Sequence, residues 1–257
     1  FHYYLCRQLK GGGMEIYMKI PKMILFDYGQ TLITEQRFDG IKGTEAVLKY
    51  ATRNKYNLTA EQIQERANEL NKEFGRYDPG KKHLLQIEIP NTMFTPYLYD
   101  SLGIEIALSN AEIDTVFWDA AAPGAPAEGM ENFLEYLKNK GIRTGVISNI
   151  SYAQSAVAGR INRMLPGNSF EFIITSSNYI FRKPNRRIFD LALEKAGLNP
   201  DETWYIGDQY ECDIKGALNA GIFPVWYIGA IDLPYKDDKN ILTVKTWDNL
   251  MEIMSVS

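Results

Sequence analysis

Short apolar runs recur along the chain, and each is bounded by charged or turn-forming residues. The runs are Lys22–Phe26, Arg143–Ile147, Phe170–Ile174, Thr203–Ile206 and Phe223–Tyr227, with a weaker one at Ile241–Val244. Continuous apolar runs of this length are typical of strands that are buried on both faces of a sheet. They predict a mostly parallel sheet covered by helices.

Helical patterns alternate with these runs from the second one onward. Apolar residues recur at helical spacing in MENFLEYLKNKG, in Ile188–Ala196 and in ECDIKGALNAG, and these segments reach Gly141, Gly197 and Gly221. Glycine just past the last turn is a common helix stop. Thr246 is a plausible N-cap for a last helix in TWDNLMEIM. The alternation predicts a doubly wound, Rossmann-like α/β fold.

The first strand does not follow this alternation, because the next strand pattern begins only at Arg143. The intervening chain is too long for an ordinary crossover. It has helical patterns of its own, at Thr44–Lys55, Thr59–Phe74, Leu84–Glu88, Asn91–Ser101 and Ser109–Phe117, and Thr59 with Gln62 fits a capping box. The stretch Ala120–Ala127 reads as a hinge back to the sheet. We therefore expect a core formed by residues 18–33 and 123–257 and a helical insert over residues 34–122.

Residues 1–17 show no clear period, no apolar core of a signal peptide and no small-residue cleavage site. We expect loose structure there. Our hypothesis is that translation of the natural chain begins at Met14 or Met18, which would make this segment a non-native extension.

Composition narrows the function classes. A formal net charge of -4 offers no basic field for a phosphate backbone, which argues against nucleic acid as a partner. The sequence lacks an apolar stretch long enough to span a bilayer, so we expect no membrane partner. Cys6 and Cys212 stand alone, which favours a reducing, cytoplasmic setting. His2 and His83 are too scattered for a zinc site. The sequence carries no signal for a particular oligomeric state.

Polar side chains stand directly after four of the expected strands. Ligands bind at the carboxyl ends of strands in open parallel sheets. If the strands are neighbours, their ends form one pocket with a carboxylate, a hydroxyl, an amide, a cation and a carboxylate pair. The residues are Asp27 after the first strand, Ser148 and Asn149 after the second, Lys183 after the third, and Asp208 and Asp213 after the fourth.

The stretch KMILFDYGQTL together with RKPNRRIFDLALEKAGLNPDETWYIGDQYECDIKGALNAGI resembles the haloacid dehalogenase-like superfamily, whose members are mostly phosphohydrolases. The resemblance covers residues 22–33 and about 124–245, and the motifs stand in the right order at the expected strand ends. The helical insert matches the position of that superfamily's C1-type cap. The resemblance implies hydrolysis of a small phosphorylated substrate.

It also implies roles for individual residues. Asp27 would attack phosphorus and form an aspartyl phosphate. Mg²⁺ would bind the carboxylates of Asp27 and Asp208 and the backbone carbonyl of Gly29, since hard oxygen ligands and a substrate phosphate suit this ion.

The remaining roles concern the phosphoryl group. Ser148 would donate a hydrogen bond to it, helped by the backbone N–H of Asn149. Lys183 would offset the charge on the nucleophile and on the phosphoryl oxygens. Asp213 would hold Lys183 or metal-bound water in place.

Gly29 is a departure from the family pattern. Family phosphatases have a second aspartate there, which protonates the leaving oxygen and later activates water. Glycine can do neither, and this loss should slow alkyl phosphates more than aryl or acyl phosphates, whose leaving groups need little protonation. Gln30 can form hydrogen bonds but cannot titrate. Glu35 and Asp39, on the segment that enters the insert, are the carboxylates that could substitute.

Two alternatives stay open. The first is a catalytically impaired family member that binds phosphate and acts as a regulatory protein. The second is phosphonatase- or dehalogenase-type chemistry. A dehalogenase would have tyrosine at position 29, and Tyr28 stands one place early. A phosphonatase needs a lysine from the insert, and the candidates are Lys42, Lys49, Lys55, Lys72, Lys81 and Lys82.

Overall fold

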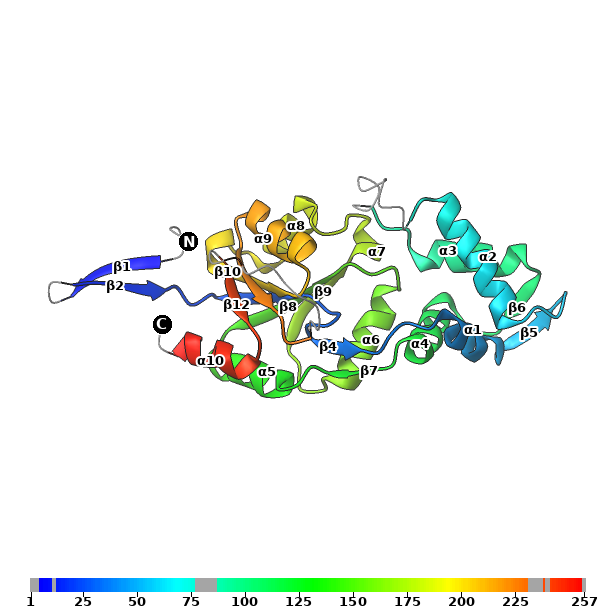
Figure 1. Cartoon of the computed structure of the whole chain (residues 1–257), viewed down its shortest axis with the longest axis horizontal. Helices are drawn as coiled ribbons and strands as arrows, with labels where there is room; N and C mark the ends of the chain where they lie inside the picture. The colour runs from blue at the N-terminus through cyan, green and yellow to red at the C-terminus, as the bar shows by residue number, and fades with distance from the viewer. Residues whose placement is uncertain (1–4, 11–12, 77–86, 231–237, 239–240, 256–257) are drawn as a thin grey trace.

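A six-stranded, entirely parallel sheet forms the centre of the protein in a computed structural model, which describes residues 5–10, 13–76, 87–230, 238 and 241–255 (Figure 1). Its strand order is β12-β11-β10-β3-β8-β9. The first strand of the core therefore lies in the middle of the sheet, between two strands that come much later in the chain. The bounds are β3 Met23–Phe26, β8 Arg143–Ser148, β9 Phe170–Thr175, β10 Thr203–Gly207, β11 Phe223–Tyr227 and β12 Leu242–Val244.

Helices cover both faces of this sheet, as the apolar runs predict. In β3, Ile24 and Phe26 pack with one set of helices, whereas Met23 and Leu25 pack with the other set. The first set is α5 (Met130–Asn139), α6 (Gln154–Met164) and α10 (Trp247–Ser255), and the second is α8 (Arg186–Ala196) and α9 (Lys215–Ala220). The two sets lie on opposite sides of the sheet in Figure 1. The doubly wound α/β prediction is confirmed.

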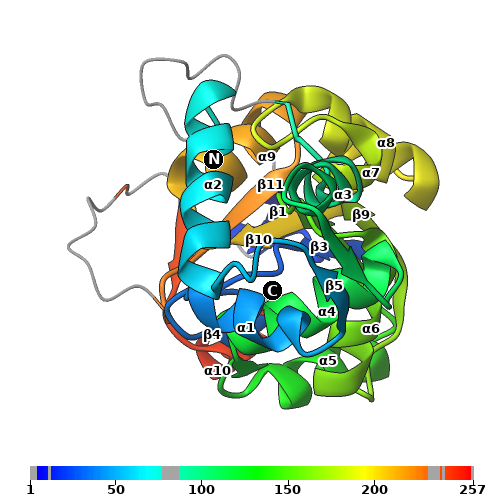
Figure 2. The same ribbon diagram turned by 90° about the vertical axis from the view of Figure 1, so that its right-hand side faces the viewer.

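The long segment between the first two core strands forms a separate helical layer at the right-hand end of the molecule in Figure 1, the end that faces the viewer in Figure 2. Its two connections to the core run side by side, because β4 (Ile33–Glu35) pairs antiparallel with β7 (Gly124–Pro126). We call the chain between these strands the insert. Its elements are α1 (Gly40–Leu48), β5 (Ala51–Asn54), α2 (Ala60–Glu73), α3 (Asn91–Ser101), β6 (Ile104–Ile106) and α4 (Asn110–Ala121).

One expectation for the insert is wrong, and another falls mostly outside the described residues. The helix expected over Thr44–Lys55 is α1, which begins at Gly40 because Asp39 caps it, and the following residues form β5, paired with β6. The helix expected over Leu84–Glu88 is absent from the part that the structure describes. Ile87 instead forms an antiparallel bridge with Phe181, and residues 84–86 lie outside the described ranges.

The caps expected from the sequence are present. Thr59 and Gln62 form the reciprocal bonds of a capping box at the start of α2. The Thr246 hydroxyl accepts the Asn249 amide hydrogen, with a nitrogen–oxygen distance of 3.2 Å, at the start of α10. Shorter elements complete the core: the helix α7 (Ser176–Tyr179), the turn η2 (Pro200–Glu202) and the wide helical turn η3 (Tyr210–Ile214).

The N-terminal segment differs from the loose structure that we expected for residues 1–17. Its described residues form an antiparallel hairpin of β1 (Leu5–Lys10) and β2 (Gly13–Met18), with Leu5 opposite Met18. In Figure 1 this hairpin projects away from the sheet. A glycine-rich sequence between two strand-forming segments is a common signal for such a hairpin. None of the helices in the described ranges is long and apolar enough to cross a membrane.

Candidate active site

The central position of β3 brings the expected polar residues together. Asp27 follows β3 directly, and its amide donates to the carbonyl oxygen of Ile206 in β10 at 2.8 Å. The neighbours β8 and β10 end at Ser148 and just before Asp208. Because three adjacent parallel strands end at the same edge, Asp27 lies between the hydroxyl and the second carboxylate.

A buried lysine joins the nucleophile candidate to a second carboxylate. The Lys183 ammonium nitrogen lies 2.6 Å from Asp27 Oδ1 and 2.7 Å from Asp213 Oδ1. It also donates to the Tyr205 hydroxyl at 2.6 Å, and this hydroxyl is 3.1 Å from Asp213 Oδ1. The Lys183 side chain is only 2% exposed, so these charges interact in a low-dielectric setting.

Sequence reasoning missed Tyr205. It lies in the middle of an apolar strand, where a tyrosine reads as a core residue. Its ring does pack in the core, against Phe189 with 5.1 Å between ring centroids. Only the sheet order brings its hydroxyl to the lysine, so no signal in the sequence could have identified it.

The Asn149 side chain holds the backbone of Lys183 in place. Its side-chain amide donates to the Lys183 carbonyl oxygen at 2.9 Å and accepts the Lys183 amide hydrogen at 2.7 Å. This pair of bonds fixes the loop after β9 against the loop after β8. The sequence predicted Asn149 as a phosphate ligand through its N–H, and the structure adds this positioning contact.

Burial raises the pKa of two carboxylates of the site. Burial raises the pKa of Asp27 to about 6, although the nearby Lys183 opposes the rise. Burial also raises the pKa of Asp208 to about 8, and the charge of Asp27 adds to the rise. Carboxylates crowded in this way favour a cation among them.

Three carboxylates have the geometry to hold a metal ion. Oxygens of Asp27, Asp208 and Asp213 all lie within 4.8 Å of one another. Asp208 Oδ1 is buried and has no hydrogen-bond partner among the described residues. A buried carboxylate oxygen without a partner is costly unless a ligand satisfies it. An all-oxygen donor set fits a hard divalent cation such as Mg²⁺, so the residues present match the metal that the sequence analysis expected.

The site is the floor of a cavity of about 800 Å³ between the sheet edge and the insert. Asp27, Ser148 and Lys183 line it from the core. The insert contributes an amide-bearing face of α2 and an apolar wall from α3 and α4, through Gln64, Asn68, Asn71, Phe94, Leu98 and Phe117.

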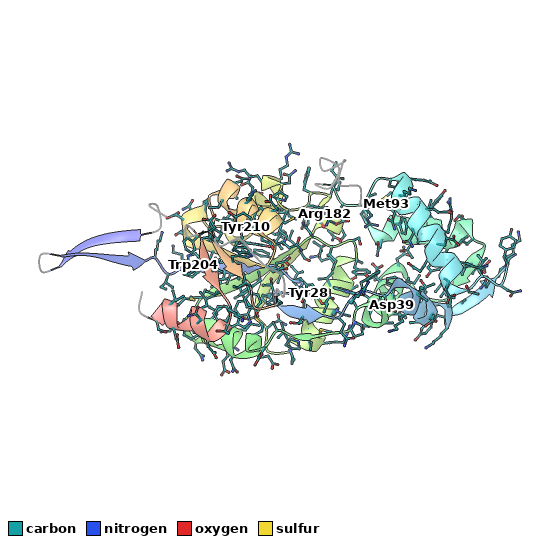
Figure 3. All side chains as sticks on the ribbon, in the orientation of Figure 1. Tyr28, Asp39, Met93, Arg182, Trp204 and Tyr210 are labelled. Atoms are coloured by element: carbon teal, nitrogen blue, oxygen red, sulfur yellow. The ribbon has the colours of Figure 1, made fainter. Side chains whose placement is uncertain are left out.

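Of the two carboxylates considered as replacements for an acid at position 29, Asp39 does not line this cavity among the described lining residues. Its side chain accepts the amide hydrogens of Ile41 and Lys42 and so caps α1. Figure 3 shows Asp39 on the insert, away from Tyr28 beside the sheet edge. A cap that satisfies two helix amides is not free for catalysis.

Glu35 does line the cavity, but it belongs to a buried network. Its Oε1 lies 3.3 Å from both the Tyr28 hydroxyl and an Arg160 guanidinium nitrogen. The same guanidinium contacts Asp119 at the end of α4 and stacks over the Trp118 ring. The network thus joins both connections of the insert to the core helix α6. No local pattern predicts this network, because Tyr28 and Arg160 lie far apart along the chain.

The insert lysines considered for Schiff-base chemistry lie elsewhere. Among the described lining residues, the lysine of the cavity is Lys183 from the core. Lys42 and Lys72 line a separate surface groove between α1 and α2. Lys81 and Lys82 lie outside the described residues.

Comparison with known proteins identifies the family of this chain. The family model described as haloacid dehalogenase-like hydrolase matches residues 21–221. A glyceraldehyde 3-phosphate phosphatase of Methanothermobacter thermautotrophicus is 33% identical over 123 residues, covering 47% of this chain and 53% of that protein. The chain thus matches about half the length of this relative. The pyrimidine 5'-nucleotidase YjjG of Escherichia coli is 28% identical over 79% of this chain and 84% of its own length.

Solved structures share the fold. A 2-haloacid dehalogenase from Pseudomonas syringae superposes with a TM-score of 0.60 at 21% identity, covering 92% of this chain and 99% of that one. A haloacid dehalogenase-like phosphatase from Thermococcus onnurineus gives a TM-score of 0.58 at 18% identity, covering 90% and 97%. The fold, the matching family model and the relatives together establish that this chain belongs to the haloacid dehalogenase-like hydrolases.

Proposed function

We propose that the protein is a Mg²⁺-dependent hydrolase of small phosphomonoesters that acts through an aspartyl phosphate on Asp27. The observation that carries the proposal is the contact of Asp27 with Lys183 at 2.6 Å, beside the carboxylates of Asp208 and Asp213, on the floor of a cavity between the sheet edge and the insert. The names of two relatives, a sugar-phosphate phosphatase and a nucleotidase, support a small phosphorylated substrate.

In the first step, a carboxylate oxygen of Asp27 attacks phosphorus, and the bond from phosphorus to the leaving oxygen breaks with its electron pair. Lys183 stabilises the negative charge that moves from the carboxylate to the phosphoryl oxygens. The Ser148 hydroxyl and the Asn149 backbone amide stand at the next strand end, where they can donate to those oxygens. In the second step, water attacks phosphorus and releases a proton to solvent, and the bond from phosphorus to the Asp27 oxygen breaks, which restores the carboxylate and frees phosphate.

Asp27, Asp208 and the Gly29 carbonyl would hold the metal, with Asp213 beside them. When bound, Mg²⁺ would offset the charge of the carboxylates and of the phosphate during transfer. The crowded carboxylates then no longer repel one another or retain protons. Asp213 would act mainly on Lys183, which it contacts at 2.7 Å.

Gly29 sets the range of substrates in this proposal. The described carboxylates near the entrance to the insert are engaged, Glu35 with Tyr28 and Arg160 and Asp39 with helix α1. An alkyl leaving oxygen then has no proton donor at position 29. Aryl and acyl phosphates leave as stable anions, so we expect them to be the better substrates.

The insert acts as a cap in this proposal. Helices α2, α3 and α4 form the wall opposite the phosphate site, so their side chains meet the part of the substrate that departs. The core would comprise residues 18–33 and 123–257, and the cap residues 34–122. Selection among substrates then depends on the insert and chemistry depends on the core.

The test is turnover of p-nitrophenyl phosphate and acetyl phosphate with and without Mg²⁺. We expect turnover that needs the metal and disappears in Asp27→Asn. Asp190→Asn is the matched control, because Asp190 lies on the exposed face of α8 and pairs with Arg186. Turnover that survives in Asp27→Asn would refute the nucleophile assignment.

A second candidate function is a phosphate-binding or regulatory protein, and Gly29 is the observation that favours it. This candidate predicts that Mg²⁺ and phosphate bind without turnover of either ester. Carbon-centre chemistry has less support, because the described cavity offers no lysine besides Lys183, which two carboxylates engage.

A further inference from the structure

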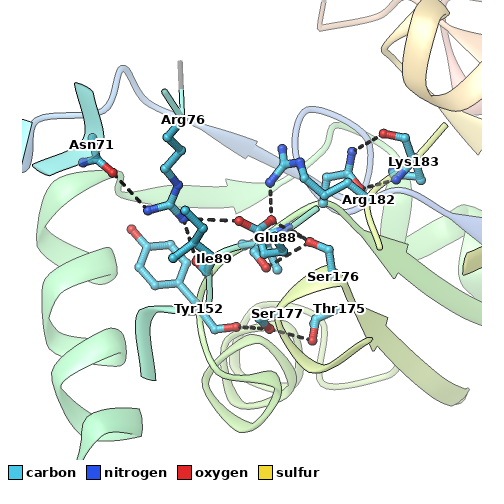
Figure 4. A network of polar contacts seen from close by, with 12 residues as sticks. Asn71, Arg76, Glu88, Ile89, Tyr152, Thr175, Ser176, Ser177, Arg182 and Lys183 are labelled. Carbon is cyan, nitrogen blue, oxygen red and sulfur yellow. Dashed lines mark hydrogen bonds and ion pairs between the residues drawn. The ribbon is translucent and has the colours of Figure 1, made fainter. Parts of the chain in front are cut away.

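Glu88 is a buried carboxylate that joins the insert to the core (Figure 4). Its side chain is 1% exposed and accepts bonds from both sides. From the insert, an Arg76 guanidinium nitrogen lies 3.2 Å from Oε1. From the core, Oε2 contacts the Arg182 guanidinium and accepts the Ser176 hydroxyl hydrogen at 2.7 Å. These partners satisfy the buried charge only while insert and core are together.

The backbone reinforces this contact. The Glu88 amide donates to the Ile180 carbonyl oxygen at 2.6 Å, and Ile87 bridges to Phe181. Ile180 has φ 68° and ψ -43°, and the Phe181 amide reaches back to the Tyr179 carbonyl oxygen, so the chain makes a γ-turn there. This conformation is strained for a β-branched residue, and it aims the Ile180 carbonyl at the insert.

The core partners of Glu88 are the neighbours of the phosphate-binding residues. Arg182 immediately precedes Lys183 in the chain. The Ser176 hydroxyl accepts the amide hydrogen of Ile150 at 2.8 Å, and Ile150 follows Asn149. One carboxylate of the insert therefore contacts the segment after β9 directly, through Arg182 and Ser176, and reaches the loop after β8 through the Ser176 hydroxyl (Figure 4).

We propose that Glu88 is a positioning residue, which sets the loops of Lys183 and of Ser148–Asn149 when the insert lies against the core. The proposal rests on the proposed function for its effect on turnover, but its structural part can be tested without any substrate. When the insert moves away, the Arg182 guanidinium and the Ser176 hydroxyl lose this acceptor, and both loops gain freedom. Closure over a substrate thus completes the phosphate site.

The first test measures amide hydrogen exchange of the whole chain in Glu88→Gln. Glutamine keeps the size but removes the charge, so the contacts with both arginines weaken. We expect exchange to rise about fivefold or more in residues 148–150 and 181–183, with no change in β3 and β10. Glu73→Gln is the matched control, because Glu73 is an exposed carboxylate of the insert that pairs with Arg66 on its own helix. Exchange that rises uniformly, or stays constant in both loops, would overturn the proposal.

The second test measures turnover of p-nitrophenyl phosphate. Misplacement of Lys183 should lower kcat by about tenfold or more in Glu88→Gln and leave KM within a few fold, because the ester is too small to need the insert. Arg182→Gln should give a similar loss, and the double variant should lose little more, since both changes break one contact. Additive losses would contradict the shared role.

Ser176→Ala covers the case in which Glu88→Gln does not fold. It removes one of the donors to Glu88 and leaves both arginines in place. We expect faster exchange at residues 148–150 alone, because Ser176 contacts Ile150. Unchanged exchange there would refute the route from Glu88 through Ser176 to the loop after β8. A wild type without any turnover would refute the proposed function, whereas the exchange results would still decide the role of Glu88.

Discussion

Replacing Gly29 by aspartate should supply the acid that this site lacks. A Cβ built on Gly29 meets no atom within 4 Å, so the cavity has room for the side chain. The backbone at this position also has no left-handed φ that only glycine tolerates. The new carboxylate would stand two residues after Asp27, beside the leaving oxygen of a phosphate bound at the sheet edge.

The expected gain in rate follows from the contribution that a positioned general acid makes to catalysis. General acid–base catalysis contributes about 10²–10⁴ in rate, which corresponds to about 2.7–5.4 kcal/mol of barrier. An alkyl ester needs the proton and should gain most of this factor. p-Nitrophenyl phosphate releases a stable anion and should gain less than about tenfold in its first step. The gain should therefore differ between the two ester classes by about tenfold or more.

The assay compares kcat/KM for sugar phosphates and for p-nitrophenyl phosphate in wild type and Gly29→Asp. Gly29→Asn is the control, because it has the same shape as the aspartate variant and cannot donate and accept a proton in turn. Equal gains for both ester classes, or equal gains in the asparagine variant, would refute the reasoning about Gly29.

Three further predictions concern stability. Lys183→Met leaves Asp27 and Asp213 buried without their cation, so the free energy of unfolding should fall by about 3–5 kcal/mol. Millimolar Mg²⁺ should restore part of this loss. Denaturant unfolding measures both effects, and the absence of any rescue by Mg²⁺ would contradict the prediction. Burial raises the pKa of Asp208 from 3.8 to about 8, so the folded metal-free protein retains a proton that the unfolded chain releases, and its stability should fall as pH rises through this window. The rise in Tm caused by Mg²⁺ should therefore be larger at pH 8.5 than at pH 5.5, as measured by scanning fluorimetry. A rise at pH 8.5 that is equal to or smaller than the rise at pH 5.5 would contradict this pH dependence. Ile180→Gly should raise the free energy of unfolding by about 1 kcal/mol, because glycine tolerates the γ-turn and the half-exposed Ile180 side chain contributes little packing. A lower free energy of unfolding in denaturant would show that the turn is not strained.

The buried strands were predictable from sequence because each is a continuous apolar run between turn signals. The same pattern located Asp27, Ser148, Lys183 and Asp208, since each directly follows a run or the loop after it. Parallel strands then bring these residues to one edge without any knowledge of side-chain contacts. These four residues could therefore be placed together from the positions of the strand ends along the sequence.

Other residues of the site could not be found in this way. Tyr205 looks like core, and only the neighbour relation of β10 and β3 turns its hydroxyl toward Lys183. Glu88 follows a weak helical pattern, whereas the structure pairs it with Ile180 from the distant loop after β9. Both contacts join segments far apart in sequence, and no local pattern encodes them.

The insert shows a related difficulty. Its helix α2 was predictable because a capping box marks its first turn. The residues after α1 were expected to continue a helix, but they pair with β6 across more than one intervening helix. A short strand of polar residues has little local signal, so tertiary pairing decided its conformation.

The most direct test of the central claim is the mass of the intact protein after brief exposure to acetyl phosphate and Mg²⁺, quenched in acid. The account predicts one added phosphoryl group on the wild type, because Asp27 accepts it and Gly29 cannot activate water to remove it. Asp27→Asn should carry none, and Gly29→Asp should lose the group faster than the wild type. An unmodified wild type, or a phosphoryl group that remains in Asp27→Asn, would contradict the account.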